Sequence, residues 1–312
     1  MLFRTREYIG LSVGTEEMIL VHVKQGRKKE LGLGKVISLP VPEGAYADGV
    51  IADRKSLVHI LAPLVKENRL KGVRASIAVN SRQAVIRSVR LPLMPEKELK
   101  QALEWEARRY IALANNQFTM DYLKLGVIDV EGAIYQDLLI VAVKENVLNE
   151  LCLLLKEAGL KILAIDVEPM AYLYLRSFAA ARGVWPALED TWASVELSAE
   201  KTTVAFYQRD TLQFVHTIPL AYNNDPYLMG DIFREVQRSF DYYHLNLKRP
   251  QTSNVYLWGK GAGQALASFQ GGLTYPVTYL PISSLTEVLN YSGEIDDSAT
   301  LALGMALREV VL

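Results

Sequence analysis

Residues 9–26, IGLSVGTEEMILVHVKQG, contain the pattern on which the rest of the chain is built. Apolar residues alternate with small or polar ones over 9–13, as expected for a half-buried β-strand. A polar turn follows at 14–17, and the apolar run at 18–23 predicts a second strand that returns beside the first. After another turn, residues 31–39 predict a third strand. The N-terminal segment is therefore predicted to be a three-stranded meander.

The meander returns in the middle of the chain. Residues 193–210, ASVELSAEKTTVAFYQRD, can be placed under residues 9–26 without a gap, and both copies read as strand, polar turn, strand and second turn. A third predicted strand follows each copy. Glu16 and Glu200 are the only identical pair, so what repeats is the order of apolar and polar residues and not the residues themselves. Two copies of one meander predict a duplicated α/β fold with a cleft between its halves.

The segments that follow each meander predict further helices and strands. In the first half, Asp53 can cap a helix, and residues 73–79 predict a short buried strand. In the second half, residues 226–243 predict an amphipathic helix and residues 255–258 a buried strand that runs into the turn GKGAG. A last helix is predicted from the run LALGMALREVV at residues 301–311.

Between the two meanders lies a segment in which predicted strands and helices follow one another in a different order. This order predicts an inserted α+β unit with its own sheet. Its best-defined element is a helix that begins at Pro95, where the missing N–H of proline is no loss. Leu99, Leu103 and Ala107 form one apolar stripe of that helix. The predicted division is residues 1–81 and 167–185 for the first half, 82–166 for the inserted unit and 186–312 for the second half.

Composition excludes several classes of function. Lys and Arg number 34 and Asp and Glu 35, so a net charge of −1 gives no overall field that attracts nucleic acid. The four histidines are scattered without the spacing of metal ligands, and no metal site is predicted. Cys152 is the only cysteine, which excludes an internal disulfide and favours a reducing compartment. The apolar runs are too short to span a membrane, so we expect a cytoplasmic protein that does not insert into the bilayer.

Several longer segments resemble one family. They are LPLMPEKELKQALEWEARRYI with MDY downstream, LLIVAVKENV, EAGLKILAIDVEPMAYL, FREVQRSFDYY and ALGMALRE. The arrangement is similar to the actin-like ATPase superfamily, and within it to the type IV pilus assembly protein PilM, with the division protein FtsA and the cytoplasmic part of GspL as relatives. The resemblance implies a duplicated fold of two ribonuclease H-like halves, with the inserted unit in the first half.

The resemblance also implies a nucleotide site in the cleft, where each repeat contributes a turn with an Asp-x-Gly. The carboxylate serves Mg²⁺, and the glycine lets backbone N–H groups approach the phosphates. Here the first turn reads SVG at 12–14 and lacks the carboxylate, while the second reads ELS at 196–198 and lacks the glycine. The turn GKGAG resembles the adenosine-side turn of the family. The implied nucleotide-binding positions are Ser12, Gly14, Thr15, Glu196, Ser198, Gly259, Gly261 and Gly263.

One further departure concerns the second half. The family carries a small lobe between the second meander and the FREVQRSFDYY helix, and only AYNNDPYLMGD lies there in this chain. Together with the altered turns, the missing lobe predicts a pseudo-ATPase. No catalytic residue is predicted, and ATP with Mg²⁺ is a cofactor that the family implies but that these departures argue against.

The expected function is therefore binding. The resemblance implies that a short cytoplasmic tail of a PilN-like, single-span membrane protein lies in a groove beside the inserted unit. Trp105 lies off the apolar stripe of its helix, so it is either a partner contact or packs on a neighbouring element. Arg109, Asp121 and Tyr122 either line the same edge or belong to a solvated rim or to local pairs.

The predicted role is a cytoplasmic adaptor of a pilus or secretion machine, held at the inner face of the membrane by its partner. Components of that machine and further copies of the chain are additional partners that the resemblance allows. The alternative is a PilM-type protein whose assembly is regulated by bound ATP. A sugar kinase of the same superfamily needs a catalytic Asp near the second meander, and none stands there.

Overall fold

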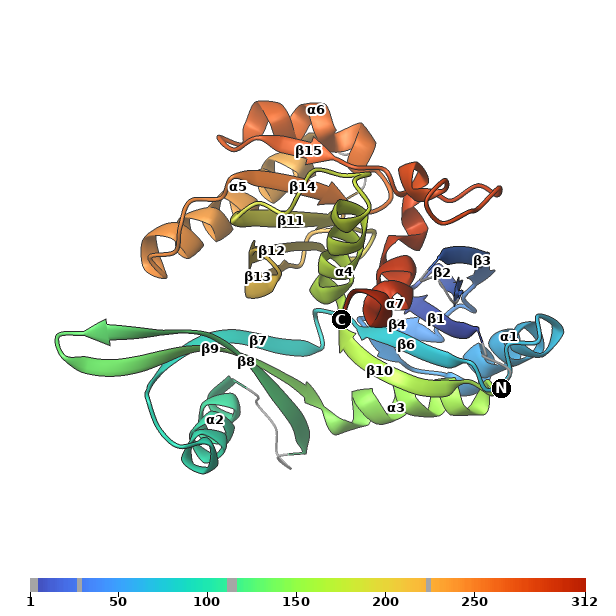
Figure 1. The fold of residues 1–312 in the computed structure, drawn as a ribbon, viewed down its shortest axis with the longest axis horizontal. Helices are drawn as coiled ribbons and strands as arrows, with labels where there is room; N and C mark the ends of the chain where they lie inside the picture. The colour runs from blue at the N-terminus through green and yellow to red at the C-terminus, as the bar shows by residue number, and fades with distance from the viewer. Residues whose placement is uncertain (1–4, 27–29, 111–116, 223–225) are drawn as a thin grey trace.

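The computed structural model of the chain describes residues 5–26, 30–110, 117–222 and 226–312. In these residues, two five-stranded sheets face each other across a central layer of helices, and a smaller three-stranded sheet projects to one side (Figure 1). The mixed α/β arrangement agrees with the predicted duplicated fold.

The first half holds one five-stranded sheet with the order β3-β2-β1-β6-β10. The strands β1, β2 and β3 form the antiparallel meander, whereas β6 and β10 run parallel to β1. A short ribbon of β4 (Tyr46–Ala47) and β5 (Val50–Ile51) precedes the first helix. The elements of this half are β1 (Arg6–Val13), β2 (Glu17–Gln25), β3 (Leu31–Pro40), α1 (Arg54–Glu67), β6 (Arg74–Val79), α3 (Glu145–Glu157), β10 (Lys161–Val167) and α4 (Glu168–Ala181).

The second half repeats this plan with the order β13-β12-β11-β14-β15. Its strands run in the same relative directions, and a π-helical turn, Tyr242–Asn246, extends its first helix. The elements are β11 (Thr191–Leu197), β12 (Thr202–Gln208), β13 (Thr211–Ile218), α5 (Pro226–Asp241), β14 (Asn254–Trp258), α6 (Ala262–Gly272), β15 (Val277–Tyr279) and α7 (Thr300–Val311). Only residues 219–225 connect β13 to α5, and 223–225 lie outside the described residues.

The two meanders match residue by residue, as the gapless repeat predicts. In the first hairpin Val13 pairs with Met18, and in the second Leu197 pairs with Thr202, which is the same register displaced along the chain. The helix and strand pattern after each meander is also the same, apart from the insertion. The prediction of a duplicated fold from 9–26 and 193–210 is confirmed.

The inserted unit is shorter than predicted. It consists of β7 (Ala84–Pro92), α2 (Glu96–Tyr110), β8 (Phe118–Val130) and β9 (Ala133–Lys144), which form a sheet with the order β7-β9-β8 covered on one face by α2 (Figure 1). The predicted range 82–166 is wrong at its C-terminal end, because α3 and β10 complete the first half and β10 pairs with β6. An amphipathic helix followed by a strand has the same sequence pattern whichever sheet it joins.

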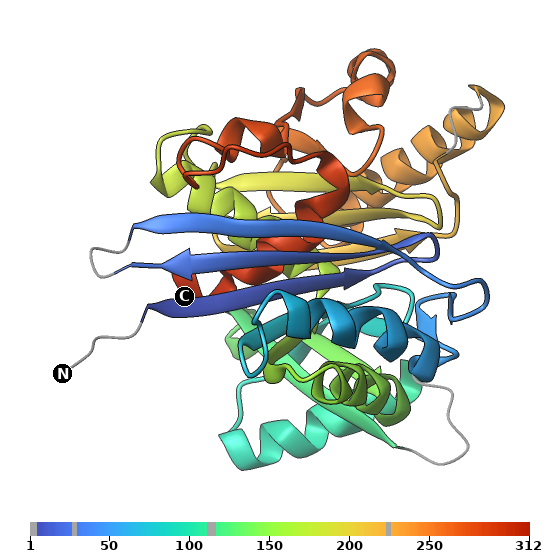
Figure 2. The ribbon, with the colours of Figure 1, turned by 90° about the vertical axis from the view of Figure 1, so that its right-hand side faces the viewer.

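Each half also gives its last helix to the other half. The predicted division places α7 in the second half with residues 186–312, yet α7 packs on β1, β2 and β6 of the first sheet. The helix α4 in turn lies against α7 and contacts β13 of the second sheet, and Tyr172 of α4 stacks on Trp258 at a centroid distance of 5.3 Å. One continuous apolar core therefore joins the halves through these two helices. In Figure 2 the strands of the first meander lie nearest the viewer, and α7 lies behind them.

An ionic cluster fastens the three-stranded sheet to the second half. Asp137 of β9 has a side chain only 5% exposed, and it accepts hydrogen bonds from Arg90 Nε at 2.7 Å and from Arg249 Nη2 at 2.9 Å. Ser88 of β7 adds a hydrogen bond to the carbonyl of Gln213 at 2.9 Å. Burial alone raises the pKa of Asp137, but the hydrogen bond from Arg90 and the charge of Arg249 lower it further, so the pKa lies below its ordinary value.

We expect Asp137→Asn to lower the free energy of unfolding by about 2 kcal/mol at pH 7, because Arg249 then loses its buried anionic partner. The folded-state pKa lies below the unfolded-state value, so the carboxylate stabilises the fold above a pH of about 4 and loses that contribution as the pH falls through the folded-state value. Urea denaturation at pH 7 and pH 3 measures both effects. Asp190→Asn, in an exposed ion pair with Arg209, serves as the control and should change stability by less than about 0.5 kcal/mol.

Candidate functional site

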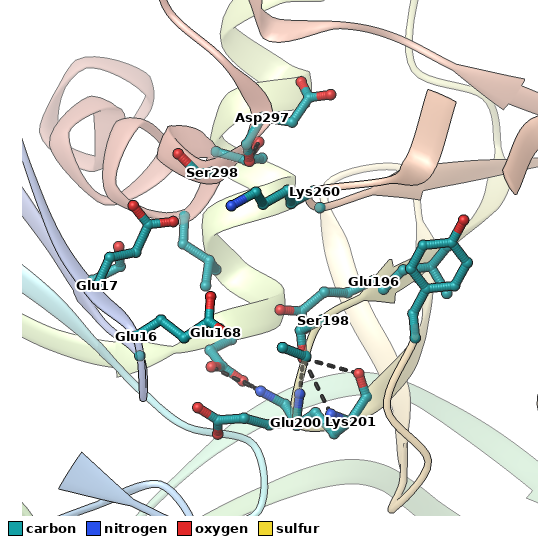
Figure 3. Close-up of a pocket in the computed structure, with 18 of the residues that line it drawn as sticks. Glu16, Glu17, Glu168, Glu196, Ser198, Glu200, Lys201, Lys260, Asp297 and Ser298 are labelled. Atoms are coloured by element: carbon teal, nitrogen blue, oxygen red, sulfur yellow. Dashed lines mark hydrogen bonds and ion pairs between the residues drawn. The ribbon is translucent and has the colours of Figure 1, made fainter. Parts of the chain in front are cut away.

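A cleft of about 470 Å³ lies between the two halves, where the first turns of the two meanders face each other (Figure 3). The turn at 14–16 comes from the first half and the turn at 198–200 from the second. Residues from α4, from the strand-to-helix turn at 259–261 and from the start of α7 complete the lining. Most of the predicted nucleotide-binding positions lie in this lining, namely Ser12, Gly14, Thr15, Glu196, Ser198, Gly259 and Gly261.

Gly263 is the exception, because a side chain there would meet the ring of Tyr279 instead of the cleft. Gly259 has a φ of +95°, and a Cβ on it would clash with the backbone of Leu197, whose carbonyl carbon would lie at 3.2 Å. Gly259 thus lets this turn approach the end of β11. That role is structural, and it is independent of any bound nucleotide.

Three backbone N–H groups of the two turns are already hydrogen-bonded within the protein. Gly14 N donates to the carbonyl of Glu17 at 2.9 Å, and Ser198 N donates to the carbonyl of Lys201 at 3.1 Å. Thr15 N crosses the cleft and donates to Glu200 Oε1 at 3.0 Å. These are the groups that would cradle phosphates in a working site of this type. A phosphate would have to displace a carboxylate to reach Thr15.

The cleft is also more acidic than basic. Its acidic lining residues are Glu16, Glu17, Glu168, Glu196, Glu200 and Asp297, and its basic ones are Lys201 and Lys260. In Figure 3, Lys260 extends across the cleft from the turn after β14, whereas Lys201 lies deeper, beside Glu168. Lys201 Nζ is 2.7 Å from Glu168 Oε2, and both side chains are almost completely buried. The lining therefore repels a polyanion unless a cation accompanies it.

The Lys201–Glu168 pair is supported by a third segment of the chain. Ser81 donates two hydrogen bonds of 2.8 Å to Glu168 Oε2, one from its backbone N–H and one from its hydroxyl. Burial alone lowers the pKa of Lys201, but the charges of Glu168 and Glu196 raise it above its ordinary value. Lys201 is therefore a fixed cation between two buried carboxyl groups.

Glu196 has fewer stabilising partners than Glu168. It is 4% exposed, and its Oε2 has no hydrogen-bond partner among the described residues. Burial raises the pKa of Glu196, while the charge of Lys201 opposes the rise. Folding therefore shifts Glu196 toward its protonated form, and the fold loses stability as the pH rises from the unfolded-state pKa to the folded-state pKa of this group.

We expect Glu196→Gln to stabilise the protein by about 1 kcal/mol at pH 8, because it removes the surplus negative charge and leaves Lys201 paired with Glu168. At pH 5 the gain should be smaller, since the raised pKa of Glu196 makes a larger share of this group protonated there than at pH 8. Thermal unfolding at the two pH values measures the difference. An equal loss of stability at both pH values would contradict this account of Glu196.

Sequence reasoning missed Glu168 and Lys201 as members of the site. Glu168 begins α4, far from either meander turn in the sequence, and only the duplicated fold brings it to the cleft. Lys201 had a weak signal, because in the gapless repeat it falls under Glu17, directly after the turn and before an apolar strand. A charged residue at the start of a buried strand requires a partner.

The predicted partner residues lie on the inserted unit, and they differ in environment. Trp105 is 76% exposed, so the alternative that it packs on a neighbouring element is wrong. Arg109 forms an exposed ion pair with Glu106 on the same helix. The Tyr122 hydroxyl donates to Glu96, and Asp121 Oδ1 accepts the backbone N–H of Tyr122 at 2.8 Å. For Arg109, Asp121 and Tyr122, the local pairs of the second alternative are present.

Two kinds of feature are absent from the described residues. Among them, no group of three or more His, Cys, Asp or Glu side chains has the arrangement of a metal site. No helix in the described ranges has the length and apolar character required to cross a membrane.

Comparison with known proteins agrees with this architecture. A solved structure described as the PilM-PilN type IV pilus biogenesis complex has a TM-score of 0.80, with 22% sequence identity over 97% of this chain and 98% of the other. A Bacteroides thetaiotaomicron protein with an actin-like ATPase fold and unknown function has a TM-score of 0.51, with 9% identity over 91% and 96%. No curated protein sequence matches the chain.

Two sheets of identical strand order, with a cleft between equivalent hairpin turns, define a protein of the actin-like ATPase fold. The sequence matches the family model of the type IV pilus assembly protein PilM over residues 10–220. The chain belongs to the PilM family.

Proposed function

We propose that the chain is a PilM-like adaptor that binds the short cytoplasmic tail of a PilN-like inner-membrane protein and does not hydrolyse ATP. Membership of the PilM family and the similarity to a structure described as a PilM-PilN complex support this partner. In this role the adaptor is held at the inner face of the membrane by its partner, as part of a pilus or a related secretion machine.

The observation that carries the non-catalytic part of the proposal is the hydrogen bond between Thr15 N and Glu200 Oε1, which joins the two turns of the cleft. An ATPase of this fold needs those turns open to phosphate and needs a carboxylate held for Mg²⁺. In this chain the carboxylate of Glu200 accepts the Thr15 N–H that a phosphate would need, the first turn has Ser12 where the resemblance implies a metal carboxylate, and Glu196 of the second turn interacts with the charge of Lys201. The groups that turnover would require are therefore either absent or engaged within the protein.

We expect Mg-ATP at millimolar concentration to leave the thermal unfolding temperature unchanged and to yield no phosphate above the buffer rate. A ligand at 100 times its Kd would stabilise the fold by about 2.7 kcal/mol, which is readily detected. The alternative, ATP-regulated assembly, has one observation in its favour, since a cleft of 470 Å³ is within the range of small-molecule sites. A clear rise in unfolding temperature would favour that alternative.

The observation that favours the inserted unit as the partner surface is the exposure of Trp105 on α2. A tryptophan in water presents a large apolar area with little conformational entropy to lose, and tryptophan is enriched among residues that dominate binding energy. An extended peptide commonly adds to an exposed strand or groove, and β8 beside α2 is an edge strand of its sheet.

The partner claim is tested with a synthetic peptide that has the sequence of the cytoplasmic head of a PilN-like protein from the same organism. Binding is followed by isothermal titration calorimetry. We expect Trp105→Ala to weaken binding by at least about tenfold. Leu245→Ala is the control, because Leu245 is 71% exposed but lies in the second half. If neither the peptide nor any other head segment of that protein binds, the adaptor role is wrong.

A further inference from the structure

A second concave site lies at the end of the first sheet where its parallel strands begin. It has a volume of about 820 Å³ and is formed by the starts of β1, β6 and β10 and by the turn between α1 and β6. In Figure 1 these strand starts lie on the right, on the far side of the first half from the projecting sheet. Its cationic lining residues are Arg6, Arg69, Lys71, Arg74 and Lys161.

The backbone holds these cations side by side. Arg74 and Lys161 are paired positions in the parallel ladder between β6 and β10. Gly72 N donates to the carbonyl of Gly159 at 2.8 Å, and Lys161 N donates to the carbonyl of Val73 at 2.9 Å, so the turn is fixed to the start of β10. The positive charges are therefore concentrated by the fold of three strands, although they are far apart in sequence.

The cations of this basic pocket lack acidic partners. Each is exposed, and none forms an ion pair with a described residue, although Glu7 lies in the same lining. Some exposed arginines elsewhere form ion pairs, as Arg234 does with Asp231 on α5. Because the whole chain has a net charge of −1, this concentration of unpaired positive charge is a local feature that its composition does not require.

We propose that the basic pocket binds the phosphate groups of acidic phospholipids at the membrane surface. Exposed lysines and arginines that contact several phosphates at once are the usual basis of attraction to anionic bilayers. A soluble nucleotide would need apolar walls that bury most of its surface, whereas Tyr8 and Val73 are the apolar lining residues here and Tyr8 is buried. The choice of a lipid as the source of phosphate rests on the proposed function, which holds the chain at a membrane.

The test is sedimentation of the full chain with vesicles of phosphatidylcholine alone or of phosphatidylcholine and phosphatidylglycerol. We expect binding only to the anionic vesicles, and a steep loss of binding when the salt concentration is raised. The double variant R74E/K161E should reduce the vesicle partition coefficient by on the order of tenfold or more. The control K97E/K100E changes the net charge equally on exposed positions of α2 and should bind like the wild type.

Thermal unfolding of R74E/K161E verifies that the variant folds, and R74Q/K161Q, with a milder change, should show an intermediate loss of binding. Glycerol phosphate and inorganic phosphate are titrated separately by calorimetry. If they bind in the micromolar range while vesicles do not, the site takes a free anion and the lipid proposal is wrong. Equal sedimentation of the wild type and R74E/K161E would also overturn it. The PilN-like peptide assay uses no lipid, so its outcome is independent of this one.

Discussion

Gly10→Ala is expected to destabilise the protein by at least about 3 kcal/mol, although it adds a single methyl group in the middle of β1. The helix α7 packs directly on this strand. A Cβ on Gly10 would lie 2.5 Å from the nitrogen of Ala306 and 2.8 Å from the carbonyl carbon of Ala302, and closer still to the carbonyl oxygen of Ala302. These are backbone atoms of a buried helix, so no rotamer change can remove the clash.

The loss should be global because α7 is the helix that the second half contributes to the first sheet. Moving it away from β1 also disturbs its packing on α4, and with it the core that joins the halves. The control is Gly32→Ala on β3 of the same sheet, where a Cβ meets no atom within 4 Å. Urea denaturation should give a stability for Gly32→Ala equal to the wild type within about 0.5 kcal/mol. A similar value for Gly10→Ala would show that α7 is not packed on β1.

The sequence predicts the repeated meanders well because their signal is local. A half-buried strand alternates, a hairpin turn is polar, and both features depend on residues close in the chain. The same local logic cannot assign a helix to a sheet. The predicted range 82–166 is too long. The sequence indicates correctly that α3 is a helix and β10 a strand, but it does not indicate which sheet they join. The position of α7 on the first sheet was missed for the same reason.

For the cleft, the predicted turn residues do lie together, because the repeat places Ser12 opposite Glu196 whatever the ligand. The resemblance to a nucleotide-binding family supplied those positions. It could not supply Glu168 and Lys201, which belong to no expected motif of the site. Their role depends on burial and on a distance of 2.7 Å between them, and neither quantity is encoded in local sequence.

Lys201→Met is expected to lower the free energy of unfolding by about 3–5 kcal/mol, because it leaves Glu168 and Glu196 buried without their shared cation. Lys201 itself stays charged from pH 5 to pH 9, since its folded-state pKa is raised and its charge is lost only above the unfolded-state value of about 10.4. The variant should be less destabilised at pH 5 than at pH 8, because burial raises the pKa of Glu196 and its protonation as the pH falls removes part of the buried negative charge.

A second substitution separates charge from packing. In the Lys201→Met background, Glu168→Gln removes the unpaired charge, and the glutamine oxygen can still accept the two hydrogen bonds from Ser81. We expect this double variant to regain at least half of the lost stability, whereas adding Glu168→Gln to the wild type should destabilise it by leaving Lys201 with Glu196 alone. Without any recovery, the pair would stabilise the fold through packing and not through its charges. Recovery would show that the charges of Glu168 and Lys201 stabilise the contact between α4 and the second meander in the lining of the cleft.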